Sequence, residues 1–222
     1  MIPVVFSDVG GTLFAGTPWN MIRHHPDFNH GAGQREILKF LPIFLLSQLK
    51  LLNESTMRQK WLARMAAALA GLSREQIHDI YHDTIHGDLQ EIMRQDVVNR
   101  LVSHKEQGAT VMLVSGIFVD FVEMIAEHIG IDGAIGTEIE YVDNIATGRL
   151  AAPPCVGQNK IDYIKQYLAE HHPGVMLNDC YGYADSYSDR ALLTAVGHGV
   201  ATYPDQRIRR MALDHDWEVI PD

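Results

Sequence analysis

The sequence predicts an α/β fold: a Rossmann-like parallel sheet with helices on both faces and an inserted all-helical cap. Two observations support this prediction. Predicted strands at residues 3–6, 109–114 and 179–184 alternate with helical stretches, a pattern typical of parallel strands with right-handed crossovers. Residues 34–102 read as helices throughout and interrupt that alternation. We therefore expect a catalytic core of residues 1–14 and 103–222, with residues 15–102 as the cap insert.

The elements of the first half follow from local patterns. Residues 3–6 are β-branched and aromatic, which favours a buried strand, and Gly10 and Gly11 supply the turn after it. Residues 14–33 are irregular, with prolines, glycines and a histidine-rich patch. In the cap, leucines and other apolar residues recur at helical spacing, and Ser73 followed by Gln76 forms a capping box that opens a helix.

The second half alternates more regularly. The apolar run at 109–114 is followed by Ser115-Gly116 and an amphipathic stretch. Further along the chain we expect a helix at 118–128, a strand at 134–139, a hairpin at 141–150 with its turn near Asp143-Asn144, a helix at 161–168, a strand at 179–184, a helix from Arg190, a strand at 199–203, a helix at 207–215 and an edge strand at 217–220.

Composition limits the classes of function. The chain has 222 residues, 46% of them hydrophobic, and a formal net charge of −10. A general nucleic-acid binder is normally basic, so the charge argues against nucleic acid as a partner. Phosphorylated small molecules stay possible, because a bound cation and backbone amides can reverse the local field inside a site.

Cysteine usage and apolar runs indicate the compartment. Cys155 and Cys180 have no metal-type spacing, and a disulfide scaffold is not expected, so a reducing cytoplasm is the default. The N-terminus shows no charged leader followed by a long apolar region. The longest apolar stretch, residues 40–46, contains Pro42 and is too short to cross a bilayer. We expect a cytoplasmic protein with no membrane partner, as a monomer or homodimer.

Polar groups follow the predicted strands or open the predicted helices at several separated places. They are Asp8, Ser115, Lys160 and the pair Asp185 and Asp189. Each alone has an ordinary explanation: a helix cap, a turn, a solvated charge, or capping of the helix from Arg190. In open α/β sheets, ligands bind at the carboxyl ends of the strands. Because these residues occur together at such positions, they indicate a functional site.

The same residues resemble the motifs of the haloacid dehalogenase-like superfamily, and most nearly its phosphoserine-phosphatase-like branch with a helical cap. The resemblance covers nearly the whole chain. Its first motif, Asp-x-Asp-Gly-Thr, matches Asp8-Val9-Gly10-Gly11-Thr12 except at Gly10. The other matches are Leu113-Val114-Ser115-Gly116, Pro153 to Lys160, and Gly182 to Asp189, with a similar tail from Gly197 through Tyr203-Pro204-Asp205 to Trp217.

The resemblance implies a role for each residue. Asp8 is the nucleophile that forms an aspartyl-phosphate. Mg²⁺ is the expected cofactor, held by Asp8, the Gly10 carbonyl and Asp185, with Asp189 holding a metal-bound water or a neighbouring group. Ser115 and the amides from Gly116 bind phosphate oxygens at a helix N-terminus, and Gly11 is a further phosphate-binding residue. Lys160 neutralises the charge that Asp8 and the phosphoryl group share.

Gly10 departs from the motif, because family phosphatases carry there an Asp that protonates the leaving oxygen and then activates water. General acid–base help is worth about 10²–10⁴ in rate, so its loss should affect alkyl phosphates most. One interpretation is a weakened phosphatase acting on a small phosphorylated metabolite, or one that uses a cap residue as proton shuttle. A second is an impaired protein that binds phosphate esters, and a third is an alteration from Asp. The nearest shuttle candidates are His24, His25, Asp27 and His30, although a surface loop is the more ordinary interpretation of that patch.

The residues around the predicted site also bear on the substrate. Gly10 permits a phosphonate hydrolase, which would need a cap lysine for a Schiff base; Lys39, Lys50 and Lys60 are available. Thr17 lies about where phosphoserine phosphatases carry a Glu that reads the substrate amino group, which argues against phosphoserine. The stretch from Phe40 to Leu52 packs in the cap core, or lines an apolar pocket or a dimer contact. Arginines that could meet an anionic substrate are Arg23, Arg35, Arg58, Arg64, Arg74 and Arg94.

Overall fold

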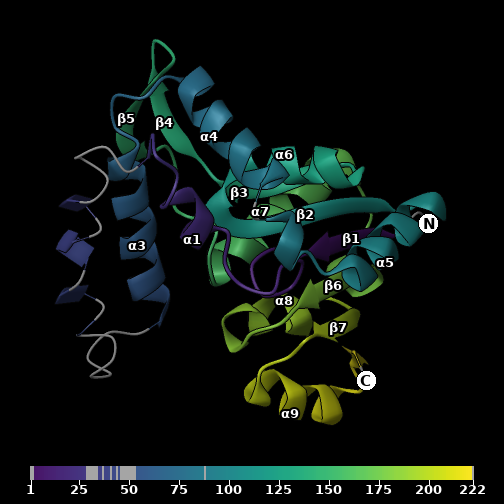
Figure 1. Cartoon of the computed structure of the whole chain (residues 1–222). Coiled ribbons are helices and arrows are strands. Elements are labelled where there is room, and N and C mark those ends of the chain that lie inside the picture. The colour runs from purple at the N-terminus through teal and green to yellow at the C-terminus, as the bar shows by residue number, and fades with distance from the viewer. Residues whose placement is uncertain are drawn as a thin grey trace.

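The computed structural model describes residues 3–28, 35–36, 38–40, 42–43, 45, 54–87 and 89–221. Its centre is a six-stranded sheet in which every pairing is parallel, in the order β3-β2-β1-β6-β7-β8 (Figure 1). The strands are β1 (Val4–Ser7), β2 (Thr110–Phe118), β3 (Gly133–Thr137), β6 (Tyr181–Ala184), β7 (His198–Thr202) and β8 (Glu218–Ile220). The helices that join them are α5 (Gln95–Glu106), α6 (Val119–Ile129), α7 (Gln158–His171), α8 (Arg190–Ala195) and α9 (Gln206–His215). The predicted Rossmann-like sheet is confirmed.

Alternation along the central strands divides the core between the two faces of the sheet. Val5 of β1 is fully buried in the cluster that α5 and α6 contribute to. Val4 and Phe6 are equally buried in the cluster formed with α7 and α8. Because successive side chains of a strand point to opposite faces, Val4, Val5 and Phe6 give β1 apolar side chains on both faces, as in other central parallel strands.

A two-stranded antiparallel hairpin follows β3. It consists of β4 (Ile139–Val142) and β5 (Ile145–Leu150), joined through Asp143 and Asn144, which both adopt positive φ. Such turns suit hairpins because their twist matches that of the strands. The predicted turn is therefore confirmed, but the predicted strand at 134–139 is wrong at its end. It is interrupted at Glu138, where the chain leaves the sheet for the hairpin.

The segment between β1 and β2 is mostly helical where it is described, with turns and irregular loops between its helices. Its helices include α1 (Trp19–Ile22), α3 (Glu54–Ala68) and α4 (Arg74–His86), with a short 3₁₀ turn at Gln90–Ile92. The capping box that opens α4 is present: the Gln76 amide donates to Ser73 Oγ, and the Ser73 amide donates to the Gln76 side chain. Most of the apolar stretch from Phe40 to Leu52 lies outside the described residues.

The hairpin contacts the helical segment, so this segment is held by packing and hydrogen bonds as well as by its two chain connections. The hairpin packs beside α3, and backbone hydrogen bonds join Gly71 and Leu72 to Ala146, and Arg74 to Asn144 (Figure 1). At the other end of the segment, α5 packs against β2. The domain boundaries at 14/15 and 102/103 stay a prediction.

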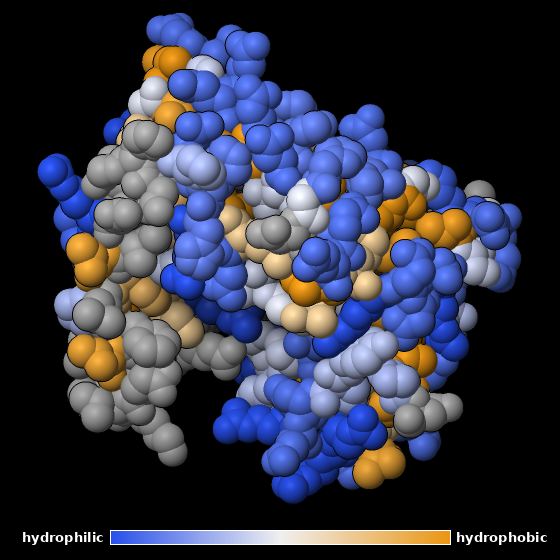
Figure 2. Space-filling view, in the orientation of Figure 1, coloured by the Kyte–Doolittle hydropathy of each residue, from blue (hydrophilic) through white to orange (hydrophobic). Residues whose placement is uncertain are grey.

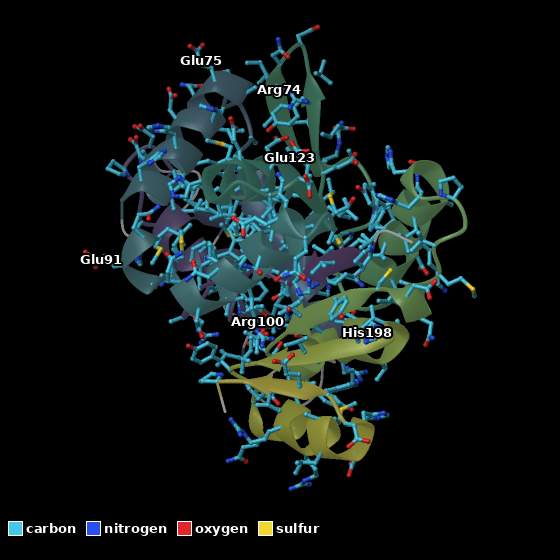
Figure 3. The ribbon with its side chains drawn as sticks, turned by 90° about the vertical axis from the view of Figure 1, so that its right-hand side faces the viewer. Arg74, Glu75, Glu91, Arg100, Glu123 and His198 are labelled. Carbon is cyan, nitrogen blue, oxygen red and sulfur yellow. The ribbon has the colours of Figure 1, made fainter. Side chains whose placement is uncertain are left out.

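Ion pairs link the later elements to this frame. Arg100 of α5 pairs with Glu218 of the edge strand β8. Arg74 extends from α4 toward the hairpin, where its guanidinium lies 3.7 Å from the Tyr141 ring centroid (Figure 3). Among the described residues, no helix is long and apolar enough to cross a membrane.

Candidate active site

Asp8 lies directly after β1, at the carboxyl edge of the sheet, and is only 6% exposed. Its backbone amide donates to the Tyr183 carbonyl (2.9 Å), which continues the pairing of β1 with β6 beyond the strand end. Its carboxylate accepts a hydrogen bond from Lys160 Nζ at 2.7 Å. Lys160 is the third residue of α7 and is 3% exposed. The predicted meeting of the first and third motifs is thus present in the structure.

Asp189 completes an ion-pair cluster with these two residues. Lys160 Nζ also donates to Asp189 Oδ1, so one ammonium group bridges two buried carboxylates. The other oxygen of Asp189 accepts hydrogen bonds from the hydroxyls of Ser186 (3.3 Å) and Ser188 (2.8 Å). With these partners, Asp189 holds Lys160 in place beside Asp8.

Attraction between opposite charges explains why these buried groups can stay ionised. Burial opposes the charge of Lys160, but Asp189 and Asp8 outweigh that effect and raise its pKa above the usual value. Burial also acts against the charge of Asp189, yet Lys160 and Arg58 keep the pKa of that carboxyl below its usual range. For Asp8, burial is the larger effect and raises its pKa, against the opposing charge of Lys160. The cluster therefore keeps Lys160 charged.

Asp185 lies beside the glycine turn after β1. The Thr12 hydroxyl donates to Asp185 Oδ1 at 3.2 Å. Gly11 has φ +82°, and a Cβ there would lie 2.1 Å from Asp185 Oδ2, so only glycine lets this carboxylate approach. Burial and the neighbouring charge of Asp8 raise the pKa of Asp185 to about 7. Two carboxylates thus face one region, with a repulsion that a cation would relieve.

The turn that carries Gly10 and Gly11 is held by backbone contacts. The Gly11 amide donates to the Gly16 carbonyl at 2.9 Å. The role of Gly11 in phosphate binding stays a prediction. The Gly11 carbonyl accepts from the guanidinium of Arg94, which also lies 3.7 Å from the Tyr203 ring centroid. Arg94, predicted only as one of several cap arginines, therefore fixes the first motif.

The second motif differs from the prediction. Ser115 and Gly116 lie within β2, which runs on to Phe118, and α6 begins only at Val119. The register between β2 and β3 shifts between Val114 and Phe118, so an irregular stretch of strand replaces the expected helix N-terminus. Ser115 Oγ accepts a hydrogen bond from the Ile117 amide at 3.2 Å.

A cavity of about 1070 Å³ joins these residues. Figure 2 shows the surface hollowed between α3 and the lower part of the molecule that contains α9. Every predicted site residue lines this cavity: Asp8, Gly10, Gly11, Ser115, Gly116, Lys160, Asp185 and Asp189. So do Thr17 and the arginines Arg23, Arg58, Arg190 and Arg207. The arginines make the lining basic although the chain is acidic overall.

Several other candidates lie elsewhere. Neither His24, His25 nor Asp27 lines the cavity; His25 instead contacts Asp83 of α4 at 3.4 Å, and His30 lies outside the described residues. The proposed Schiff-base lysines have no support either. Lys39 and Lys60 are exposed and do not line the cavity, and Lys50 is outside the described part. Among the remaining arginines, Arg64 pairs with Glu36 and Arg74 with Asp120.

The cavity has an aromatic wall that the sequence did not predict. Trp19 and Trp61 line it, together with Phe40. The spacing of Trp61 with later apolar residues of its helix indicated only that it packs in the cap, because a helical period does not distinguish a core face from a cavity face. Trp19 gave no local signal beyond its position after the first motif.

Some, but not all, of the predicted metal ligands suit a metal ion in this structure. Among the described residues, no group of three His, Cys, Asp or Glu is placed to hold a metal ion. Asp189 is engaged by Lys160 and by two hydroxyls, which leaves the carboxylates of Asp8 and Asp185 and the Gly10 carbonyl. One or two carboxylates with further oxygen ligands suit Mg²⁺, which usually keeps several waters. The residues present therefore fit a hard divalent cation.

Comparison with known proteins places the chain in a family. A model described as haloacid dehalogenase-like hydrolase matches residues 5–194. The chain belongs to the haloacid dehalogenase-like hydrolase family. Among its curated relatives, "Phosphoserine phosphatase SerB1" of Mycobacterium tuberculosis is 30% identical over 214 residues, which are 96% of this chain and 60% of the relative. "Probable phosphatase Rv3661" of the same organism is 30% identical over 151 residues, 68% of this chain and 52% of the relative. The chain therefore spans about three fifths of the first relative and half of the second.

Solved structures agree with this fold. A protein with unknown function from Bordetella pertussis Tohama I superposes with a TM-score of 0.83 at 22% identity, covering 99% of this chain and 98% of that one. A substrate-bound phosphoserine phosphatase complex superposes with a TM-score of 0.62 at 17% identity, covering 95% and 90%. At these identities the superpositions establish that the fold is shared.

Proposed function

We propose that this protein is a Mg²⁺-dependent phosphohydrolase that acts on a small phosphorylated molecule through Asp8. The observation that carries the proposal is the buried Lys160, whose ammonium bridges Asp8 and Asp189 at the base of a basic cavity. A phosphoryl group beside Asp8 would meet this positive charge directly. Phosphoryl transfer depends mainly on positioning and on electrostatic stabilisation, and the site supplies both.

Two steps account for hydrolysis. In the first, an oxygen of Asp8 bonds to phosphorus while the bond from phosphorus to the leaving oxygen breaks. In the second, water attacks the aspartyl-phosphate, releases phosphate and restores the carboxylate. Lys160 offsets the charge that builds up on the transferring group, and Asp189 keeps Lys160 beside Asp8. Ser115 lines the same cavity and offers a hydroxyl to the phosphate oxygens.

The metal would be held by Asp8, Asp185 and the Gly10 carbonyl, with Asp189 acting through Lys160. When bound, the ion supplies positive charge that lowers the repulsion between the carboxylates and the phosphate. Replacement of Asp by Gly at position 10 keeps the carbonyl, so a metal site is compatible with this sequence.

Gly10 itself favours a second candidate, a protein that binds phosphate esters with little or no turnover. It provides no proton donor for the leaving oxygen, and the described histidines of the first loop do not replace it. The exposed Lys39 and Lys60 give no support for carbon–phosphorus cleavage.

The test is Mg²⁺-dependent hydrolysis of acetyl phosphate and p-nitrophenyl phosphate by the native chain and by Asp8→Asn. We expect turnover by the native chain and its loss, by about 10³-fold or more, in the variant, since the nucleophile is removed. Full activity in Asp8→Asn would show that Asp8 is not the nucleophile. Binding without turnover in the native chain would favour the second candidate.

A further inference from the structure

The cavity that contains Asp8 has an apolar and aromatic wall on its cap side. Trp19 of α1, Phe40 and Trp61 of α3 line it, and the rings of Phe40 and Trp61 lie 4.8 Å apart between centroids in an edge-to-face arrangement. Leu62 of α3 and Ile117 of β2 also line the cavity. This wall and the ion-pair cluster around Lys160 therefore belong to one continuous space.

The size of the cavity fits a ligand larger than a phosphorylated amino acid. At about 1070 Å³ it lies slightly above the range of about 300–1,000 Å³ that is usual for ligand pockets. Its only carboxylates in the described lining are Asp8, Asp185 and Asp189. All of them belong to the proposed catalytic centre, so no described carboxylate faces the aromatic wall to recognise an ammonium group. An apolar leaving group suits this space.

The leaving oxygen finds little acid help in the described part of the cavity. No histidine or glutamate lines that part, and position 10 is a glycine. Without a proton donor, an alkoxide is a poor leaving group, whereas a phenolate leaves with its electron pair far more easily. The shape of the cavity and its chemistry therefore favour the same kind of molecule.

We propose that the substrate is an aryl phosphomonoester whose leaving group is a bulky, apolar aromatic ring system bound against Trp19 and Trp61. This inference rests on the proposed function and names its substrate class. In the reaction, an Asp8 oxygen bonds to phosphorus, the bond from phosphorus to the aryl oxygen breaks, and its electron pair leaves on the phenolate. The phenolate then takes a proton from one water, and a second water hydrolyses the aspartyl-phosphate to the Asp8 carboxylate and dihydrogen phosphate, which returns a proton to the hydroxide that the first water left.

Binding can be tested without turnover. Two of the three tryptophans of the chain line the cavity, and isothermal titration calorimetry measures the affinity of an occupant without interference from naphthyl fluorescence. We expect 2-naphthylphosphonate to bind about tenfold more tightly than phenylphosphonate, because the second ring buries further apolar area. Equal affinities would overturn the inference, whatever the enzyme's activity.

Two pairs of substrates separate the effect of leaving-group size on kcat/KM from the effect of leaving-group acidity. Phenyl and 2-naphthyl phosphate differ mainly in apolar area, whereas 2-naphthyl and 2-naphthylmethyl phosphate differ mainly in the leaving oxygen. We expect kcat/KM to rise about tenfold from phenyl to 2-naphthyl phosphate. It should fall by about 10²-fold or more from 2-naphthyl to 2-naphthylmethyl phosphate. Hydrolysis of acetyl phosphate with no preference for the naphthyl ester would overturn the inference and leave the proposed function intact.

Matched tryptophan variants locate the effect. Trp61→Leu should lower the ratio of 2-naphthyl to phenyl kcat/KM about threefold or more, because it removes part of the wall. Trp217 packs with the α9 cluster, where its ring lies close to Gly199, away from the cavity. Trp217→Leu should therefore leave the ratio unchanged. If both variants change it equally, the preference does not arise at the aromatic wall. If no substrate is hydrolysed but 2-naphthylphosphonate still binds tightly, the proposed hydrolase function is wrong and the aryl-binding pocket is supported.

Discussion

The departure at position 10 can be reversed by one substitution, Gly10→Asp, and the structure has room for it. A Cβ at this position would meet its nearest neighbours, Gly16 O and Pro18 Cδ, at 3.8 Å, which is ordinary van der Waals contact. The residue is not among those with positive φ, so a side chain brings no backbone strain. At the adjacent Gly11, by contrast, a Cβ would collide with the Asp185 carboxylate. Position 10 therefore accepts a carboxylate where position 11 cannot accept a methyl group.

The size of the effect follows from the proton transfer that the new carboxyl group would supply. General acid–base help is worth about 10²–10⁴ in rate, or about 2.7–5.4 kcal/mol of activation free energy. The gain should be largest for alkyl phosphates, whose leaving oxygen needs the proton, and small for acetyl phosphate. We expect the ratio of alkyl to acyl phosphate kcat/KM to rise by about 10²-fold or more in Gly10→Asp.

The assay is steady-state hydrolysis of 2-naphthylmethyl phosphate and acetyl phosphate at saturating Mg²⁺. Gly10→Asn is the matched control, because it has nearly the same shape and cannot transfer the proton; its ratio should stay that of the native chain. The reasoning is refuted if a folded Gly10→Asp protein shows no gain on the alkyl ester. It is also refuted if Gly10→Asn gains equally.

Further predictions concern the metal, pH and packing. Asp185→Asn should raise the Mg²⁺ concentration for half-maximal turnover about tenfold or more, while the exposed Asp162→Asn should not; a Mg²⁺ titration decides. Burial lowers the pKa of His104, so below about pH 6.5 the unfolded chain binds more protons than the folded protein does, and the free energy of unfolding should fall as pH drops. In urea unfolding, the free energy of unfolding should therefore differ less between pH 5.5 and pH 7.5 in His104→Gln than in the native chain. Gly148→Ala should cost about 1–3 kcal/mol more than Gly174→Ala in urea unfolding, because both have positive φ but only Gly148 faces a neighbour, Ala70 Cβ, at 2.8 Å. Equal costs would mean that the contact between Gly148 and Ala70 is not tight.

Most of the sheet could be predicted because its signals are local. The apolar run before Asp8 and the change of pattern near residue 109 reflect the burial of all of β1 and most of β2, which side-chain chemistry alone reveals. The capping box at Ser73 and the turn at Asp143-Asn144 were predictable for the same reason, since each depends on neighbouring residues. The candidate site followed because the ends of parallel strands meet at one edge.

The remainder depends on contacts between distant segments. Nothing local distinguishes a serine in an irregular strand from one at a helix start, so Ser115 was placed in the wrong element. The hydrogen bond from Arg94 to the Gly11 carbonyl joins residues 83 positions apart in the sequence, and no local sequence pattern predicts it. The orientation of Trp61 toward the cavity likewise depends on how α3 is placed over the sheet.

The hairpin formed by β4 and β5 determines which residues must be moved together if the helical segment is exchanged between relatives. It lies outside the segment between β1 and β2, yet its backbone pairs with the connection between α3 and α4 through Ala146 and Asn144. The placement of the helices above Asp8 is therefore encoded partly by residues 139–150. A chimaera that exchanges the helical segment with a relative must carry this hairpin along, because a foreign hairpin would seat the new helices at a different tilt over the nucleophile.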